Sequence, residues 1–414
     1  MSTKKGYKSV PWLFGKEIEI PEDWAFQKIK DCCNILDSKR IPINSEERKK
    51  IQGNIPYYGA NGIQGYVNDH IFDEEIILLA EDGGYFEEYK TRPIAQYVIG
   101  KSWVNNHAHV LNSKKNILLK WIFYSLVHKN ITRYINGSTR TKLNQSDLQQ
   151  ISILISPLQE QQKITSILSN VDSLIESTSK IIKNSKSLKT GLMQKLLTRG
   201  IGHTKFKKVP WFYGKEIEIP EEWNVKLINE LGNVVRGASP RPAGDSKFFG
   251  GIIPWITVAE LTKDNQMYLK STSSTLTNEG KQQSRFLESG TFVIANSGAT
   301  LGVPKILRIS GCANDGIAVI LELKGIISEF LYYRIFSWID LLRNVNQGIG
   351  QPNLNTTIIG KLKIPLPPLP EQQKIATILS NIDSKITSQE QYKEKLLLLK
   401  KSLMQKLLTG EVRV

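Results

Sequence analysis

Two long segments of the chain repeat apolar positions with the period of an amphipathic helix. In both, apolar residues recur every seven residues and again three or four residues later, which places them on one helical face. No proline or glycine interrupts the first between Glu160 and Thr190, or the second from Glu371 to Gly410. The pattern predicts two helices, each about 39 residues and roughly 58 Å long. The predicted apolar faces comprise Ile164, Ile167, Leu168, Val171, Leu174, Ile175, Thr178, Ile181, Ile182, Ser185, Leu188 and Leu192 in the first helix, and Ile375, Ile378, Ile382, Tyr392, Leu396, Leu399 and Leu403 in the second.

Helices of this length need a partner for their apolar face, and the two faces are alike. We therefore expect the two helices to pack against each other, and the long segment between them permits an antiparallel arrangement. The alternative is that each helix is buried separately in a larger core.

The segments that precede the helices are β-rich. Short runs of β-branched and aromatic residues are separated by glycine, asparagine and aspartate, as in "GIQGYVNDHIFDEEIILLAEDGGYFEEY" and "SGTFVIANSGATLGVPKIL". This pattern predicts two mixed modules with similar starts and ends, since Leu143 and Asn144 correspond to Leu354 and Asn355.

An internal repeat relates the two halves of the chain. "VPWLFGKEIEIPEDW" at Val10–Trp24 recurs as "VPWFYGKEIEIPEEW" at Val209–Trp223, and "LMQKLLT" recurs unchanged at Leu192 and Leu403. "EQQKITSILSNVDSLI" from Glu160 also returns, as "EQQKIATILSNIDSKI" from Glu371. A repeat of this length indicates two copies of a whole domain. We assign the repeated tryptophans, which are Trp12, Trp24, Trp211 and Trp223, to packing.

Charge and cysteine content narrow the class of protein. The net charge is +16, spread along most of the chain, which favours a polyanionic partner such as nucleic acid over an ordinary basic enzyme. The three cysteines match neither a disulfide framework nor a zinc motif, which fits a reducing cytoplasm. The sequence shows no signal peptide and no apolar run long enough to span a membrane.

Catalytic motifs are missing. The chain has neither a P-loop nor the Asn/Asp-Pro-Pro-aromatic run of amino-methyltransferases. His107 and His109 would share one face of a strand, but without a matched carboxylate they are weak evidence for a metal. "EDGG" at Glu81–Gly84 is more typical of a turn than of an ion-binding loop. We therefore expect no catalytic residue and no metal site, and favour a binding protein over an enzyme.

The duplicated lead, the variable modules and the paired Glu-Gln-Gln helix starts resemble the DNA specificity subunit of type I restriction-modification systems, over essentially the whole chain. The resemblance implies an α+β fold: two mixed α/β target recognition domains joined by two long antiparallel coiled-coil helices, with pseudo-twofold symmetry. It implies a lead at residues 1–24, recognition domains at 25–157 and 224–368, a central conserved region at 158–223 and a C-terminal helix at 369–414.

The resemblance also implies the function. Each recognition domain would read one half of a bipartite site in double-stranded DNA, and the helices would set the gap and dock two methyltransferase subunits, through which restriction/translocase subunits join. The subunit itself would carry no catalytic centre and bind no cofactor, whereas the restriction endonuclease/adenine methyltransferase complex would use S-adenosylmethionine, ATP and Mg²⁺. The alternatives are a single-chain restriction or modification enzyme, a coiled-coil scaffold without DNA specificity, and a stand-alone DNA-binding regulator.

Candidate DNA-reading residues are polar or cationic side chains in loops, because base edges and phosphates are read by such donors. In the first module we expect Tyr57, Tyr58, Asn61, Lys90, Arg92, Asn105, Asn106, His107, Arg140 and Lys142. In the second we expect Arg236, Ser239, Arg241, Lys247, Asn296, Ser297, Gln347, Gln351 and Asn353. The repeated "LMQKLLT" supplies the candidate partner-binding residues Gln194, Lys195, Gln405 and Lys406.

Overall fold

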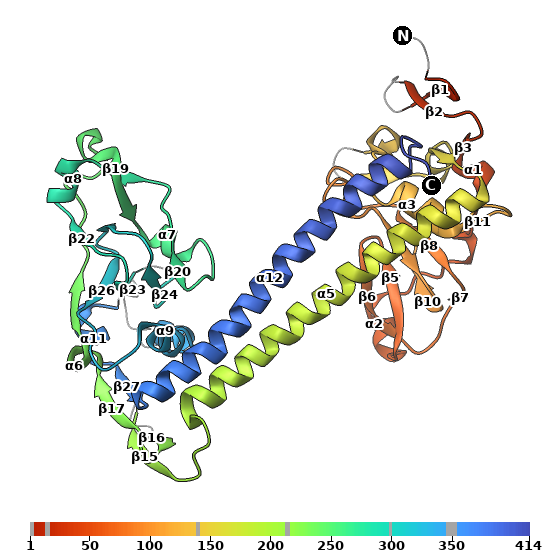
Figure 1. Cartoon of the computed structure of the whole chain (residues 1–414). Helices are drawn as coiled ribbons and strands as arrows, with labels where there is room; N and C mark the ends of the chain where they lie inside the picture. Colours follow the sequence, from red (N-terminus) through yellow and green to blue (C-terminus); the bar gives the residue numbers. More distant parts are fainter. Residues whose placement is uncertain (1–3, 13–16, 138–140, 212–215, 298–299, 345–353) are drawn as a thin grey trace. The chain divides into compact units, whose positions relative to one another are not determined.

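The computed structural model describes residues 4–12, 17–137, 141–211, 216–297, 300–344 and 354–414. The chain divides into two compact units (Figure 1), one made of Met1–Ser179 and Gln391–Val414 and the other of Lys180–Glu390. Each unit holds one β-rich module and one half of each of two long helices. These helices are α5 (Leu158–Arg199), of 42 residues, and α12 (Leu369–Leu407), of 39 residues.

The first unit contains two four-stranded sheets. One sheet has the order β4-β11-β8-β9 and is antiparallel throughout; the other has the order β6-β5-β10-β7, with β5 and β10 parallel. Their strands are β4 (Cys33–Ile35), β5 (Ile55–Gly59), β6 (Gly62–Val67), β7 (Phe72–Asp73), β8 (Ile76–Ala80), β9 (Ala95–Val98), β10 (Lys101–Val104) and β11 (Ala108–Ser113). The remaining elements are β3 (Ala25–Lys28), α1 (Ile29–Cys32), η2 (Asp37–Lys39), α2 (Ser45–Lys50), α3 (Leu119–Leu126), η3 (Thr132–Tyr134), β12 (Ile135–Asn136), β13 (Lys142–Leu143), α4 (Gln145–Leu148) and β14 (Ser152–Ile155).

The second unit repeats this construction. A five-stranded sheet has the order β18-β26-β23-β24-β20, and a four-stranded sheet has the order β21-β19-β25-β22, with β19 and β25 parallel. Their strands are β18 (Asn233–Arg236), β19 (Phe249–Ile256), β20 (Tyr268–Leu269), β21 (Thr275–Leu276), β22 (Arg285–Leu287), β23 (Phe292–Ala295), β24 (Pro304–Leu307), β25 (Gly311–Ala313) and β26 (Ile317–Leu321). The remaining elements are β17 (Asn224–Leu227), α6 (Ile228–Leu231), η5 (Ser246–Phe248), α7 (Val258–Thr262), α8 (Asn278–Gln282), α9 (Ser328–Phe336), α10 (Ile339–Asn344), α11 (Thr356–Gly360) and β27 (Lys363–Leu366).

Both faces of strand β8 are buried in the first unit. Ile77 and Leu79 of β8 join the core cluster under α3, whereas Ile76 and Leu78 join the cluster against the second sheet. This alternation follows from the two-residue period of a strand and explains why β8 is apolar at every position. In Figure 1, α3 lies beside α5, and the hydroxyl of Tyr124 donates to Asp172 of α5 at 2.8 Å.

The second unit has the corresponding contact. The hydroxyl of Tyr333, in α9, donates to Asp383 of α12 at 2.8 Å. The two modules are thus attached to their helices by the same kind of hydrogen bond, although "LKWIFYSL" and "SEFLYYRIF" share few residues.

The two leads form hairpins of identical register. β1 (Tyr7–Pro11) pairs with β2 (Glu17–Pro21), and β15 (Phe206–Pro210) pairs with β16 (Glu216–Pro220). Trp24 and Trp223, which follow these hairpins, are completely buried, and each indole Nε1 donates to the glutamate that begins a long helix, Glu160 at 2.9 Å and Glu371 at 3.0 Å. This confirms the packing role of these tryptophans and gives the Glu-Gln-Gln starts a specific partner.

The two long helices pack together, as expected, and run antiparallel within each unit (Figure 1). In the first unit Lys400 of α12 pairs with Asp172 of α5 at 2.6 Å. In the second unit Lys189 pairs with Asp383 and Lys186 pairs with Glu390, both at 2.6 Å. Helix α5 also continues through Gly191, so it is slightly longer than predicted.

The contact face of the helices differs from the prediction. The buried seam uses the residues at every seventh position and those four later, such as Ile164 and Leu168 or Thr178 and Ile182. The residues three later are exposed: Leu174 is 45% exposed, Ile181 41% and Leu188 56%. The apolar residues occupy three positions of each heptad and form three columns along the helix. The contact between two helices covers only two of these columns, so the third stays exposed. On α12 the same column leaves Ile378, Tyr392 and Leu399 exposed.

Candidate DNA interface

In each unit a three-residue turn leads into an inner strand of one sheet, β11 in the first unit and β26 in the second. Asn105, Asn106 and His107 precede β11, and Asn314, Asp315 and Gly316 precede β26. The first residue of each turn donates its backbone N–H to the neighbouring sheet, from Asn105 to Tyr58 at 3.1 Å and from Asn314 to Ile256 at 2.9 Å. The two modules therefore present equivalent turns.

Two further segments meet each turn. In the first unit the backbone N–H of Glu81 donates to the backbone oxygen of His107 at 2.9 Å, and the N–H of Leu143 donates to the backbone oxygen of Glu81 at 2.7 Å. In the second unit the backbone N–H of Asn296 donates to the backbone oxygen of Gly316 at 3.0 Å, and the N–H of Leu354 donates to the backbone oxygen of Asn296 at 2.9 Å. The correspondence of Leu143 with Leu354, predicted from the repeat, is thus a structural equivalence, and it brings three loops to one edge of each module.

Candidate residues of the second module converge on one aspartate, Asp315. Arg236 donates from Nε to the backbone oxygen of Asp315, Ser239 donates to Asp315 Oδ1 at 2.8 Å, and Arg241 donates to Asp315 Oδ2 at 3.2 Å. The Arg241 side chain is 69% exposed, so most of its five N–H donors face solvent. Asp315 orients two guanidinium groups without covering them, a suitable arrangement for phosphate or guanine contacts.

More cations lie around this cluster. Arg285, which the sequence did not single out, donates from Nε to the backbone oxygen of Arg236 at 2.7 Å. Lys281 lies over the Phe286 ring at 3.9 Å, and Lys247 lies over Phe248 at 4.7 Å. All three cations are exposed, so this edge of the second module carries a positive surface.

In the first module the turn is part of a smaller polar cluster. The Nδ1 atom of His107 lies 2.8 Å from Asp82 Oδ1, and Asn61 donates from Nδ2 to the backbone oxygen of Gly83 at 2.8 Å. Exposed Lys142 pairs with Glu81 at 3.2 Å. The structure thus brings together Asn61, Asn106, His107 and Lys142 from three separate sequence segments.

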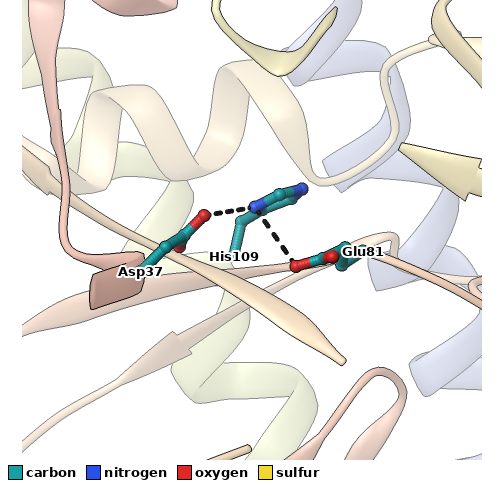
Figure 2. A group of neighbouring side chains, drawn as sticks. All are labelled: Asp37, Glu81 and His109. Atoms are coloured by element: carbon teal, nitrogen blue, oxygen red, sulfur yellow. Dashed lines mark hydrogen bonds and ion pairs between the residues drawn. The ribbon is translucent and has the colours of Figure 1, made fainter. Parts of the chain in front are cut away.

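A buried ion network supports this edge from below (Figure 2). The Nδ1 atom of His109 lies 2.6 Å from Asp37 and 3.7 Å from Glu81, and its Nε2 atom lies 2.8 Å from the backbone oxygen of Leu143. Both ring nitrogens therefore face oxygen atoms. Arg40, another residue that the sequence did not single out, pairs with Glu81 at 2.7 Å and donates to the backbone oxygen of Ala108 at 2.8 Å.

The same network bears on metal binding. Asp37, Glu81 and His109 form the one group in the described part of the chain with the composition of a metal site, and the carboxylates that the sequence did not predict near the histidines are present. However, Arg40 and Lys142 already form ion pairs with the Glu81 carboxylate, and their positive charges would repel a bound cation. The residues fit a structural ion network better than a metal site.

The two neighbouring histidines do not share a strand face. β11 begins at Ala108, so His107 belongs to the turn and is partly exposed, whereas His109 is buried in the strand. The expectation from period-two spacing was wrong, since the spacing argument holds only when both residues lie in the strand.

Three candidate DNA-reading residues are too buried to reach a base. Tyr57, Asn105 and Asn296 are at most 3% exposed. Tyr57 donates its hydroxyl to the backbone oxygen of Ile43 at 3.1 Å, and Asn105 Oδ1 accepts from the His107 N–H at 2.8 Å. The side chains of Tyr57 and Asn105 thus hold loops in place. Tyr58 is half-buried, and burial raises the pKa of its hydroxyl, while Ser297 is partly exposed beside Gly316.

The other candidates lie elsewhere or outside the described residues. Lys90 and Arg92 are exposed but belong to a segment beside α3, where the backbone oxygen of Tyr89 lies 2.7 Å from His128 Nδ1. Arg140, Gln347, Gln351 and Asn353 lie outside the described residues. The candidate partner-binding residues Gln194, Lys195, Gln405 and Lys406 are all exposed on their helices. None of the described helices is long and apolar enough to cross a membrane.

Comparison with known proteins identifies the family. The model for the type I restriction modification DNA specificity domain matches residues 21–185 and 220–398. A putative type I restriction enzyme specificity subunit, S.HindORF215P of Haemophilus influenzae, is 30% identical over 385 residues, which cover 90% of this chain and 89% of that protein. The MjaVIII specificity subunit of Methanocaldococcus jannaschii is 29% identical, over 96% of this chain and 95% of that protein.

Solved structures share the fold. The S subunit of a type I restriction-modification system from M. genitalium has a TM-score of 0.64 at 16% identity, covering 93% of this chain and 96% of that chain. A chain from a structure on complex assembly and conformational transition of the type I R-M system has a TM-score of 0.53 at 14% identity, covering 95% and 99%. With two mixed modules joined by paired helices, this chain belongs to the non-catalytic DNA specificity subunits of type I restriction-modification systems.

Proposed function

We propose that each module reads one half of a bipartite site in double-stranded DNA, with recognition domains at residues 25–157 and 224–368. The observation that carries this proposal is the repeated construction of the loop edge, in which equivalent turns at Asn105–His107 and Asn314–Gly316 receive equivalent returning segments. Two readers of the same design but different side chains suit two different half-sites.

The reading residues in this proposal are the exposed members of the two clusters. In the second module Arg236 and Arg241 lead, supported by Ser239, Lys247 and Arg285; in the first module Asn61, Asn106, His107 and Lys142 take this role. Phosphate contacts outnumber base contacts in such interfaces, so cations near the rim position the DNA and the turn residues distinguish its bases.

The helix pair holds the two methyltransferase subunits in this proposal. The exposed apolar residues Leu174, Ile181 and Leu188, which recur every seven positions on one side of α5, support it, because apolar side chains repeated on one exposed helix face suit an interaction site. The exposed residues Gln194 and Lys195 of α5, and Gln405 and Lys406 of α12, are the other partner-binding residues in this proposal. Restriction/translocase subunits would join through the methyltransferases, and those other subunits would use S-adenosylmethionine, ATP and Mg²⁺ in the cytoplasm.

The helix length also sets the gap in the DNA site in this account. Helices of 42 and 39 residues are roughly 60 Å long at 1.5 Å per residue, and one turn of DNA is about 34–36 Å. We therefore expect several unspecified base pairs between the half-sites.

A binding and methylation assay tests the proposal. The subunit mixed with its methyltransferase is expected to methylate one bipartite sequence, and neither protein alone is expected to do so. A subunit that methylates or cleaves DNA by itself would instead favour a single-chain enzyme, and a complex without site preference would favour a scaffold.

A further inference from the structure

A groove of about 870 Å³ lies in the first unit, between the second half of α12, the end of α3 and the segment around Tyr89. On the α12 side the lining includes exposed apolar side chains: Leu397 is 47% exposed and Leu398 is 68% exposed. Met404, and Leu408 just after the helix end, are partly buried beside them. Two adjacent exposed leucines on a helix whose seam is already filled are not needed for folding of the helix pair.

A buried lysine lines the same groove. Lys129 is 9% exposed, and its Nζ atom lies 4.1 Å from the centroid of the Trp12 ring. Among the residues that the structure describes, Lys129 has no carboxylate partner and makes no hydrogen bond through its side chain. Burial lowers its pKa to about 8, because its ammonium group has lost water without gaining a counter-ion. A carboxylate placed in the groove would supply that counter-ion.

Other charges around the groove have the same sign. Lys90, Lys401 and Lys400 line it, the last already paired with Asp172, and Glu394 is the one acidic residue among the lining side chains. The groove therefore combines exposed apolar side chains with several lysines, which is complementary to an acidic segment that also carries apolar side chains.

The corresponding place in the second unit is filled by the chain itself. Trp338 stands where Lys129 stands in the first unit, and its ring lies 5.1 Å from that of Trp211, the counterpart of Trp12. Met193 and Leu197, the counterparts of Met404 and Leu408, are buried in the same core cluster as Trp338 and as Leu342 of α10. At the positions of Leu397 and Leu398, α5 carries the polar residues Lys186 and Ser187.

Gln405, one of the candidate partner-binding residues, also lines the groove, so the groove is continuous with the surface assigned above to a methyltransferase subunit. Because the described residues leave this place open in the first unit and fill it in the second, the two docking positions are unequal. We propose that the groove receives an acidic, apolar segment of one of the two methyltransferase copies, with a carboxylate on Lys129 and apolar side chains on Leu397 and Leu398. This copy binds first and more tightly. The inference rests on the proposed function.

Titration of the full-length subunit with its methyltransferase, followed by native mass spectrometry and calorimetry, tests this inference. For the wild-type subunit we expect two binding steps whose dissociation constants differ about tenfold or more. The double variant Leu397→Ser/Leu398→Ser and, separately, Lys129→Met are expected to weaken the tighter step about tenfold and leave the weaker one unchanged. The matched control is Ser187→Ala at the counterpart of Leu398, which is expected to change neither step.

The outcomes separate the inference from the proposed function. Two unchanged steps in both groove variants would overturn the inference while leaving methyltransferase docking intact. A wild-type subunit that binds no methyltransferase would instead overturn the proposed function. If the double variant abolished self-association of the subunit in sedimentation experiments without methyltransferase, the occupant would be a second copy of this chain, which also contradicts the inference.

Discussion

Arg413 and Asp23, separated by 390 residues, form a two-pronged ion pair in which both terminal nitrogens of the guanidinium lie within 2.8 Å of the carboxylate. Arg413 also contacts Glu160, the buried first-turn residue of α5 that accepts from Trp24. Since the hydroxyl of Tyr7 donates to the backbone oxygen of Gly410 at 3.0 Å, the end of the chain is tied to its start.

The same place in the second unit is closed by a continuous chain. There His203, in the segment that links α5 to the second lead, contacts Glu371 at 3.0 Å. The first lead thus completes the end of α12 as the second lead completes the end of α5. Each copy of the lead thus makes the same kind of contact with a long helix, which gives the repeat of the lead a structural explanation.

Replacing Arg413 by alanine is expected to destabilise the first unit by about 1–3 kcal/mol, because it leaves the buried carboxylate of Glu160 without its cation. Hydrogen exchange is expected to rise in β1 and β2 but not in β15 and β16. The matched variant His203→Ala should show the reverse pattern, and equal exchange in both hairpins of either variant would contradict the assignment.

The same contact predicts a dependence on pH. The hydrogen bond and charge of Arg413 hold the pKa of Asp23 below its ordinary value. A carboxyl group whose pKa is lower in the folded than in the unfolded chain stabilises the fold at pH values above the unfolded-state pKa. This contribution is lost as the pH falls through the folded-state pKa. The stability difference between wild type and Asp23→Asn is therefore expected to be full at neutral pH and to shrink below about pH 4. A difference that stays constant down to pH 2 would contradict this.

The positive edge of the second module predicts a specific loss of DNA binding. Arg236→Ala and Arg241→Ala are each expected to weaken binding to the cognate site and to reduce the slope of log affinity against log salt by about one if the residue contacts a phosphate. Lys324→Ala is the control, because Lys324 follows β26 at the opposite end of the strand from Asp315. Normal site-specific methylation in both arginine variants would remove these residues from the interface.

The exposed and the buried columns of α5 predict opposite phenotypes. Ile182→Ala, in the seam, is expected to lower stability by about 2–4 kcal/mol through a cavity, with methyltransferase binding retained once folded. Leu188→Ser, in the exposed column, is expected to leave the melting temperature within about two degrees and to weaken methyltransferase binding. If Leu188→Ser destabilised the subunit and left binding unchanged, Leu188 would belong to a folding contact.

The Lys129 environment predicts a gain of stability. Because burial lowers the pKa of Lys129 to about 8, the unfolded chain binds more protons than the folded one between about pH 8 and 10, and stability rises over this range. Lys129→Met is expected to raise stability at pH 7 by roughly 1–3 kcal/mol and to remove this rise. A less stable variant would show that the contact with Trp12 outweighs the cost of burial.

The sequence alone was sufficient to predict the parts of the fold that repeat. The duplicated leads, the two long helices and their antiparallel contact follow from motifs and periodicity, and the structure agrees with them. The seam was less predictable, because Leu174 and Ile182 are equally apolar and only the second helix decides which of them is covered.

The candidate interface was predictable only in outline. Loop position predicted Arg236, Ser239 and Arg241, but not that all three would meet Asp315, because that contact spans more than 70 residues of sequence. The "NDG" turn in "GCANDGIAVI" was the available signal. Tyr57 looked like a polar loop residue and is a core residue, since its hydroxyl finds a backbone partner that the sequence does not reveal.

Mapping of methylated bases in a host genome shows whether two independent readers address two half-sites. The genome of a host expressing this subunit with its methyltransferase is sequenced, with wild type and with the Arg236→Ala/Arg241→Ala double variant. We predict one bipartite motif with a fixed gap for the wild type, and relaxed sequence choice in one half only for the variant. A single uninterrupted motif, or equal relaxation of both halves, would contradict the account.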